Sequence, residues 1–215
     1  MAEVCPTITA YSIEEYRRQM EKIAPFANRI QIDLTDGKFT KQKTVGPEDA
    51  WWPAGVKADF HLMYKDPMAA LEVILKHKPN LVIMHAEAEG NFESFRHYCQ
   101  KSGTKVGIAL LPKTGPESIE PALQRINHVL IFSGNLGYQG GSHANLELLK
   151  KVKYLKNLRP DLEVGWDGGV NQNNISQLVF GGVDVFNVGG AIQSAEDPEQ
   201  MFRSLSRIAE ETGTT

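Results

Sequence analysis

Cysteine is scarce in this sequence: the 215 residues include two, Cys5 and Cys99. Their wide separation, with no C-x-x-C spacing, argues against a disulfide framework and against a zinc site built on thiolates. We interpret both as buried apolar side chains of a protein that works in a reducing compartment.

An excess of positive charge is also missing. Lys and Arg together number 23 and Asp and Glu 26, which gives a formal net charge of −3. A protein that binds the phosphate backbone of a nucleic acid needs a basic surface. The charge balance therefore predicts no nucleic-acid partner.

Long hydrophobic runs are absent as well. No stretch approaches the roughly 18 uninterrupted apolar residues that indicate a membrane span. The first twenty residues carry several charges and lack the continuous apolar segment of a signal peptide. We therefore expect a cytoplasmic protein with no membrane partner.

The chain does contain a regular alternation of short β-branched runs and segments with helical periodicity, which is typical of parallel βαβ units. The eight predicted strands are 4–9, 29–34, 57–63, 81–85, 105–110, 128–133, 163–166 and 184–188. The seven predicted helices are 12–24, 67–77, 91–102, 117–124, 144–157, 172–180 and 197–211. A short turn at 48–52 stands where an eighth helix would be expected.

Eight units of similar length, about 27 residues each, leave no room for a second domain. We predict an α/β fold, a single-domain (β/α)₈ TIM barrel over residues 1–215. The alternative is a doubly wound open sheet, but eight nearly equal units favour closure. In such a barrel the active site lies at the C-terminal ends of the strands.

Three of the predicted strands carry an ionisable side chain near that end, Asp33, His61 and Asp167. Strand alternation places Gln31 on the same face as Asp33. A single residue of this kind is more often structural than functional. Together they offer the oxygen and nitrogen ligands of a divalent metal. Two carboxylates on well-separated strands can also act on opposite faces of one substrate carbon.

Glycine pairs follow the last two strands, at Gly168–Gly169 and Gly189–Gly190, and the loop at 133–141 is also rich in glycine. The backbone amides of such loops frequently bind phosphate. The alternative is that tight turns alone require these glycines. We predict a phosphorylated small molecule as the ligand.

Other charged residues are less informative. Four lysines, at 150, 151, 153 and 156, crowd one predicted helix, and we interpret them as a solvated face. His85 and Glu87 point the same way at the end of the fourth strand, as supporting residues of the site or as polar residues of the rim.

These features resemble the ribulose-phosphate 3-epimerase family, and the similarity runs nearly from end to end. It is carried by CPTI at 5–8, IDLTDGKF at 32–39, DFHLM at 59–63, HAEA at 85–88, GIALLPKT at 107–114, SGNLGYQGG at 133–141, WDGGVN at 166–171 and FNVGGAI at 186–192.

The resemblance implies an isomerase that epimerises ketose phosphates such as D-ribulose 5-phosphate and D-xylulose 5-phosphate. It implies that Asp33 and Asp167 take a proton from one face of carbon 3 and return it to the other through an enediolate. It also implies a divalent metal, Zn, Mn, Fe or Mg, held by Asp33, His61 and Asp167. The family's fourth ligand, a histidine, corresponds to Gln31 here.

The resemblance further implies a phosphorylated sugar as the partner and a homo-oligomeric assembly. The residues it places around the sugar phosphate are Thr7, His61, Met63, Gly137, Gly140, Gly168, Gly169, Gly189 and Gly190. The reacting end departs from the family's pattern, at Gln31 and at Leu111, which replaces an asparagine.

Two alternatives to this epimerase stay open. One is a barrel that binds a phosphorylated ligand but has lost turnover, and the other is an isomerase of a different sugar phosphate. Related decarboxylases of keto-acid sugar phosphates carry a D-x-K-x-x-D motif on the third strand, which reads KADFHLM here. That activity is therefore disfavoured.

Overall fold

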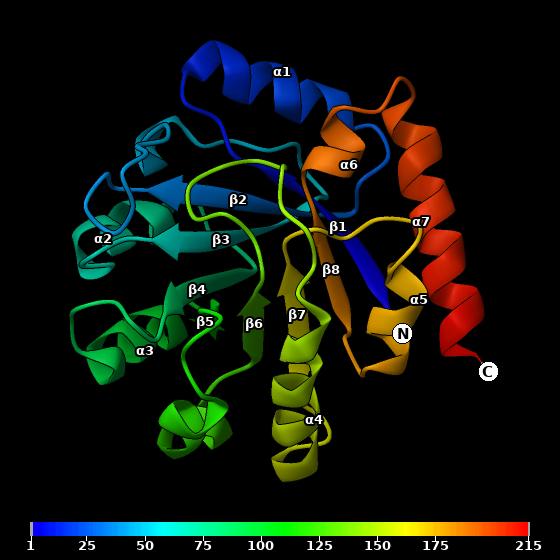
Figure 1. The fold of residues 1–215 in the computed structure, drawn as a ribbon. Helices are drawn as coiled ribbons and strands as arrows, with labels where there is room; N and C mark the ends of the chain where they lie inside the picture. The colour runs from blue at the N-terminus through cyan, green and yellow to red at the C-terminus, as the bar shows by residue number, and fades with distance from the viewer. Residues whose placement is uncertain (1, 215) are drawn as a thin grey trace.

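The computed structural model describes residues 2–214, and its eight parallel strands close into a barrel in chain order (Figure 1). The strands are β1 (Glu3–Ile8), β2 (Arg29–Thr35), β3 (Lys57–Met63), β4 (Leu81–His85), β5 (Lys105–Leu110), β6 (His128–Phe132), β7 (Glu163–Asp167) and β8 (Val185–Val188). The predicted TIM barrel is confirmed, and the open-sheet alternative is wrong.

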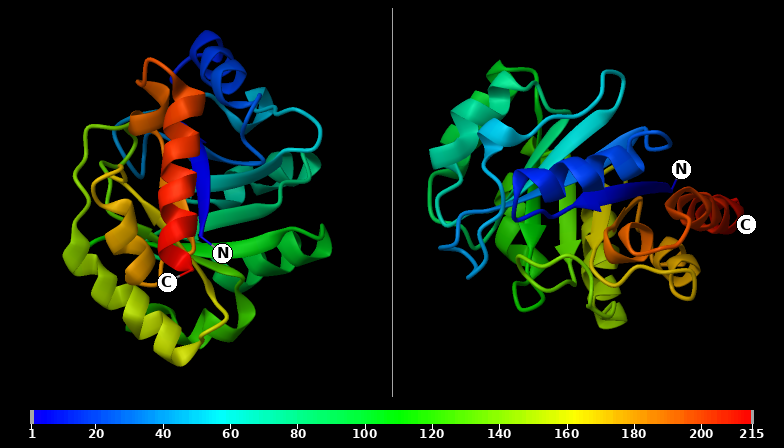
Figure 2. Two further views of the ribbon diagram at one scale, coloured as in Figure 1. Left: turned by 90° about the vertical axis from the view of Figure 1, so that its right-hand side faces the viewer. Right: turned by 90° about the horizontal axis from the view of Figure 1, so that it is seen from above.

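Helices cover the outside of the barrel, and the last of them runs along β1 (Figure 2). The α-helices are α1 (Ile13–Ile23), α2 (Met68–Lys76), α3 (Phe92–Lys101), α4 (Leu149–Leu158), α5 (Ile175–Phe180), α6 (Gly190–Gln193) and α7 (Pro198–Gly213). The 3₁₀ helices are η1 (Pro47–Asp49), η2 (Pro116–Arg125) and η3 (Leu146–Leu148). Within residues 2–214, none of these helices combines the length and apolarity needed to span a bilayer.

Side-chain caps explain where several helices begin. The Ser12 hydroxyl accepts the backbone N–H of Glu15, and the Glu15 carboxylate accepts that of Tyr11. Asp197 accepts the N–H of Gln200 in the same manner at the start of α7. These contacts satisfy N–H groups that have no partner inside the helix.

The helices differ from expectation where proline or a loop intervenes. The segment predicted as a helix at 117–124 is 3₁₀ throughout, with Pro116 at its start and Pro121 inside it. Pro121 lacks the N–H that an α-helix would use there. The helix predicted at 144–157 begins with η3, the helix predicted at 172–180 is confined to 175–180, and α6 was not predicted.

The four lysines near α4 do not form one solvated face. Lys150 and Lys153 are exposed, but Lys151 is buried. Its ammonium donates to the carbonyl oxygens of Leu111 and Thr114, at 2.7 Å each. Lys156 binds Asp184 at 2.6 Å. Periodicity alone did not distinguish these two lysines, because their acceptors lie in distant loops.

The barrel interior is layered. Alternation along the strands directs the small apolar cluster of Leu81, Ile83, Ala109 and Leu130 inward. At the N-terminal end of the barrel, the guanidinium of Arg29 binds Asp59 at 2.6 Å, Glu163 at 2.9 Å and Glu3 at 3.0 Å. Asp59, which shares its strand face with His61, therefore belongs to this ion cluster and not to the opposite rim.

We predict that Arg29→Met destabilises the protein by about 3–5 kcal/mol, the cost of leaving a buried charge without its partner. The Asp59 side chain is 4% exposed, so it has little water to replace the guanidinium. Urea unfolding measures the difference. Arg17→Met is the matched control, because the ion pair of Arg17 with Glu21 is exposed; it should unfold as the wild type does. Equal stability of the two variants would contradict the prediction.

Candidate active site

The ends of β2, β3 and β7 bring together the three ionisable residues that the sequence singled out. Asp33 lies opposite His61 in the register of β2 and β3, and Asp167 is the last residue of β7. The Nδ1 atom of His61 is 3.0 Å from Asp33 Oδ1 and 3.7 Å from Asp167 Oδ2. One potential ligand atom from each residue lies within 4.8 Å of the others. The predicted convergence at one rim is therefore confirmed.

Gln31 joins this cluster from below. Its side-chain NH₂ donates to Asp33 Oδ1 at 2.9 Å and to Asp167 Oδ2 at 2.6 Å. Gln31 is 1% exposed, so no water competes for these contacts. The amide thus bridges the two carboxylates and reduces their mutual repulsion.

The donor set of Asp33, His61 and Asp167 fits a divalent metal. One imidazole nitrogen and two carboxylate oxygens form the kind of three-ligand set that leaves a position open for substrate. Gln31 presents its NH₂ group, and not its oxygen, to the same space. To ligate a cation, the amide would have to turn and give up both hydrogen bonds, so the fourth ligand is weaker than an imidazole.

Asp167 has the electrostatics of an acid–base group. Burial, followed by the nearby charge of Asp33, raises the pKa of Asp167 to about 7, while His61 and the Gln31 amide act in the opposite direction. A carboxyl with a pKa near neutrality is suited both to donating and to accepting a proton at physiological pH.

A second histidine lies directly behind His61. The Nε2 atoms of His61 and His85 are 2.8 Å apart, and His85 Nδ1 lies 3.3 Å from Glu87 Oε2. Both rings are 0% exposed, and Phe132 packs against each of them. Of the two interpretations left open by the sequence, His85 and Glu87 therefore support His61, and His85 is not part of an exposed rim.

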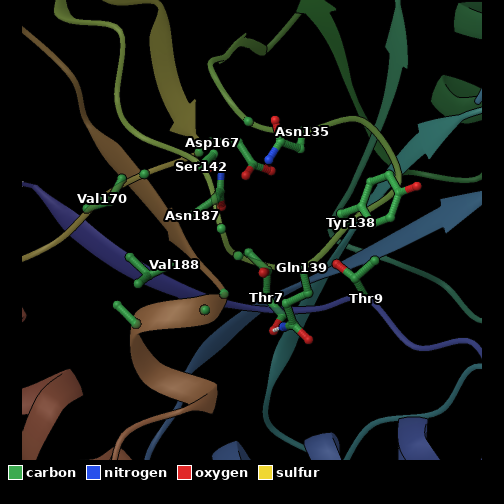
Figure 3. A pocket seen from close by; sticks show the side chains of 18 of the residues that line it. Thr7, Thr9, Asn135, Tyr138, Gln139, Ser142, Asp167, Val170, Asn187 and Val188 are labelled. Carbon is green, nitrogen blue, oxygen red and sulfur yellow. Dashed lines mark hydrogen bonds between the residues drawn. The ribbon is translucent and has the colours of Figure 1, made fainter.

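A cavity of about 270 Å³ opens above Asp33 and Asp167. Figure 3 shows Thr7, Thr9 and Asn187 around it, with Asn135, Tyr138 and Gln139 contributed by the loop after β6. The predicted ligand residues on its wall are Thr7, Met63, Gly140, Gly168, Gly169, Gly189 and Gly190. The glycine-rich loops after β6, β7 and β8 therefore meet at one side of the cavity.

Two of the predicted ligand residues do not line this cavity. His61 is fully buried and reaches the site through Asp33. Gly137 lies against the side chains of Thr40 and Gln42, and its carbonyl accepts the Tyr11 hydroxyl at 2.7 Å. In this structure Gly137 shapes the loop over the cavity.

The glycines of the wall are required by close backbone approaches. A Cβ on Gly168 would lie 2.2 Å from the backbone nitrogen of Gly134, and one on Gly169 would lie 2.1 Å from that of Ala144. Both glycines also have positive φ, 114° and 74°. The tight-turn explanation is thus correct for these two residues, and it accompanies their position at the cavity.

Asn187 is a cavity residue that the sequence reasoning missed. It is 3% exposed, and its Nδ2 atom has no hydrogen-bond partner within the described residues. A buried unpaired donor is costly, which marks it as a group that a ligand would satisfy. Its spacing could have revealed it, because alternation along β8 directs Asn187 inward beside Asp167.

Comparisons with known proteins agree with this geometry. A model described as "Ribulose-phosphate 3 epimerase family" matches residues 3–193. The ribulose-phosphate 3-epimerase of Helicobacter pylori is 30% identical over 212 residues, which cover 96% of this chain and 97% of that protein. The enzyme of the same name from Bacillus subtilis is 27% identical over 214 residues, 95% of this chain and 98% of that protein.

Among solved structures, KGPDC from Streptococcus mutans, in complex with a phosphorylated D-sugar, superposes with a TM-score of 0.77 at 14% identity, covering 98% of each chain. The 3-hexulose-6-phosphate synthase from Salmonella typhimurium gives 0.75 at 13% identity, covering 98% of this chain and 99% of that one. At this level of identity the likeness shows the fold alone.

We predict that Gln31→His increases the affinity for a divalent metal by roughly tenfold or more, because it adds an imidazole ligand where the amide now opposes the cation. Isothermal titration of the metal-stripped protein with Zn²⁺ and Mn²⁺ measures the effect. Gln31→Leu removes the amide without adding a ligand and should not reproduce the gain. Stoichiometric zinc that survives dialysis of the wild type against a mild chelator would show that the site is not weakened.

Proposed function

Because the chain belongs to the ribulose-phosphate 3-epimerase family, and hence to the isomerases that epimerise sugar phosphates, we propose that it interconverts D-ribulose 5-phosphate and D-xylulose 5-phosphate. The observation that carries the proposal is the pair of carboxylates, Asp33 and Asp167, at the base of a cavity whose wall holds three glycine-rich loops. A sugar phosphate has the matching parts, an acidic C–H at one end and a dianion at the other.

In this reaction Asp33 and Asp167 act on opposite faces of carbon 3. One carboxylate removes the proton while the other, protonated, supplies one to the opposite face of the enediolate. The raised pKa of Asp167 favours a protonated carboxyl near neutral pH. The two aspartates then exchange roles in the reverse direction.

The negative charge of the enediolate needs a stabilising group beside its oxygens. His61 and the NH₂ of Gln31 lie next to both aspartates and provide positive or partially positive charge. A divalent metal, Zn, Mn, Fe or Mg, held by Asp33, His61 and Asp167 would add a Lewis acid at the same place.

The phosphate would bind at the side of the cavity formed by Gly140, Gly168, Gly169, Gly189 and Gly190. Their lack of side chains lets a dianion approach the backbone amides closely. Thr7, Met63 and the unpaired amide of Asn187 line the space between the phosphate and the reacting carbon. A structural neighbour solved in complex with a phosphorylated D-sugar supports a ligand of this class.

The second candidate function is binding of a sugar phosphate without turnover. The double donation from Gln31 favours it, because the amide ties both carboxylates in the place where the family has a metal ligand. An isomerase of another sugar phosphate would use the same residues on a different carbon.

We predict epimerisation of D-ribulose 5-phosphate, followed by a coupled assay for xylulose 5-phosphate with and without added Zn²⁺, Mn²⁺, Fe²⁺ or Mg²⁺. Asp33→Asn and Asp167→Asn should each reduce kcat by about 10²–10⁴-fold, the usual contribution of one general acid or base. Lack of turnover by the wild type under every condition, with the phosphate ligand still bound, would instead support the binding protein.

We also predict that Ser142→Asp weakens phosphate binding. Ser142 lines the cavity on the same wall as the glycine loops, so a carboxylate there repels the dianion. Ser142→Asn is the neutral control of the same size and should bind as the wild type does. Titration with inorganic phosphate and with ribulose 5-phosphate measures both. If the two variants bound phosphate equally, the glycine wall would not be the phosphate site.

A further inference from the structure

Four residues form a continuous hydrogen-bonded chain from the loop after β4 to the aspartates. It runs from Glu87 to His85 at 3.3 Å, from His85 to His61 at 2.8 Å, and from His61 to Asp33 at 3.0 Å. Each imidazole uses both of its ring nitrogens in the chain. The position of the hydrogen on one ring therefore determines its position on the next.

The outer end of the chain is fixed by Glu87. Its Oε1 atom accepts the backbone N–H of Leu111 at 3.0 Å and the hydroxyl of Thr114, which leaves Oε2 for His85. Burial would raise the pKa of Glu87, but the contacts from His85, Thr114 and Leu111 lower it, so the group is a carboxylate. The buried ammonium of Lys151 holds the carbonyl oxygens of Leu111 and Thr114, and so keeps these two donors in place.

The donor and acceptor roles then follow in order. A carboxylate is only an acceptor, so Nδ1 of His85 carries a hydrogen. A neutral His85 has no hydrogen left for Nε2, which therefore accepts. Two ring nitrogens 2.8 Å apart need one hydrogen between them, so it resides on Nε2 of His61. The Nδ1 atom of His61 is left to face Asp33 and Asp167 with its lone pair.

We propose that Glu87 is a positioning residue that acts through His85 to hold the hydrogen of His61 on Nε2. His61 then offers Nδ1 to whatever positive species lies between it and the aspartates, whether a metal ion or the proton in transfer. This inference rests on the proposed function only for its consequence in catalysis, because the positions of the hydrogens are a property of the free protein.

Glu87→Gln provides a sharp test because the chain gives its amide one favourable orientation. Leu111 N–H and Thr114 O–H both need an oxygen, so the side-chain NH₂ of the variant faces His85. Nδ1 of His85 then accepts, its Nε2 donates to His61, and Nε2 of His61 becomes bare. The substitution keeps the size of the side chain and inverts both histidines.

Nitrogen-15 spectra of metal-free, histidine-labelled protein distinguish protonated from bare ring nitrogens. In the wild type we expect hydrogens on Nδ1 of His85 and on Nε2 of His61, and in Glu87→Gln we expect Nε2 of His61 to be bare. Glu89→Gln, two residues along and with an exposed side chain, is the control and should leave both rings unchanged. A wild-type hydrogen on Nε2 of His85, or unchanged rings in a folded Glu87→Gln, would overturn the proposal.

Metal affinity provides a second readout. Moving the hydrogen of His61 to Nδ1 blocks the nitrogen nearest the aspartates, so Glu87→Gln should bind Mn²⁺ or Zn²⁺ about 10–100-fold more weakly, as other losses of a ligand's supporting partner do. Wild-type affinity in the variant would overturn this consequence. Neither measurement requires turnover, so failure of the epimerase proposal would be recognised separately, by the activity assay.

Discussion

Two buried carboxylates that face the same small space are the constraint on which the rest of the site depends. Two unit charges about 4 Å apart repel by roughly 4 kcal/mol at an effective dielectric constant of 20. Asp33 and Asp167 approach to this range, and the chain surrounds them with the Gln31 amide and the His61 ring. The raised pKa of Asp167 is the remaining expression of that repulsion. A group that must hold a proton near neutral pH is also one that can transfer it.

The barrel separates this strained end from the end that supports it. Arg29, Asp59 and Glu163 form the ion cluster at the N-terminal ends of the strands, and apolar residues fill the layer between that cluster and the site. Substitutions at the C-terminal rim can therefore alter the chemistry with little effect on folding. This division is consistent with a chain that keeps the fold and the glycine wall of its family while Gln31 replaces a ligand.

The sequence predicted most of the backbone because strand alternation and helix caps are local signals. All eight strands lie within a residue or two of their expected bounds, and Asp33, His61 and Asp167 meet as expected. The contacts that could not be predicted join residues far apart in the chain. The acceptors of Lys151, the approach of His85 to His61 and the unpaired amide of Asn187 all depend on how strands and loops pack across the barrel. The orientation of the Gln31 amide likewise follows from two carboxylates on different strands.

Exchange of the carbon-3 hydrogen in deuterated water tests the two-carboxylate account most directly. Each aspartate reaches only one face, so a variant with one aspartate left should exchange the epimer whose C–H points toward that aspartate, without converting it to the other. Asp33→Asn and Asp167→Asn are therefore predicted to label opposite epimers, one ribulose 5-phosphate and the other xylulose 5-phosphate. If both variants labelled the same epimer, or if neither labelled any while the wild type epimerised, proton transfer by Asp33 and Asp167 on opposite faces would be wrong.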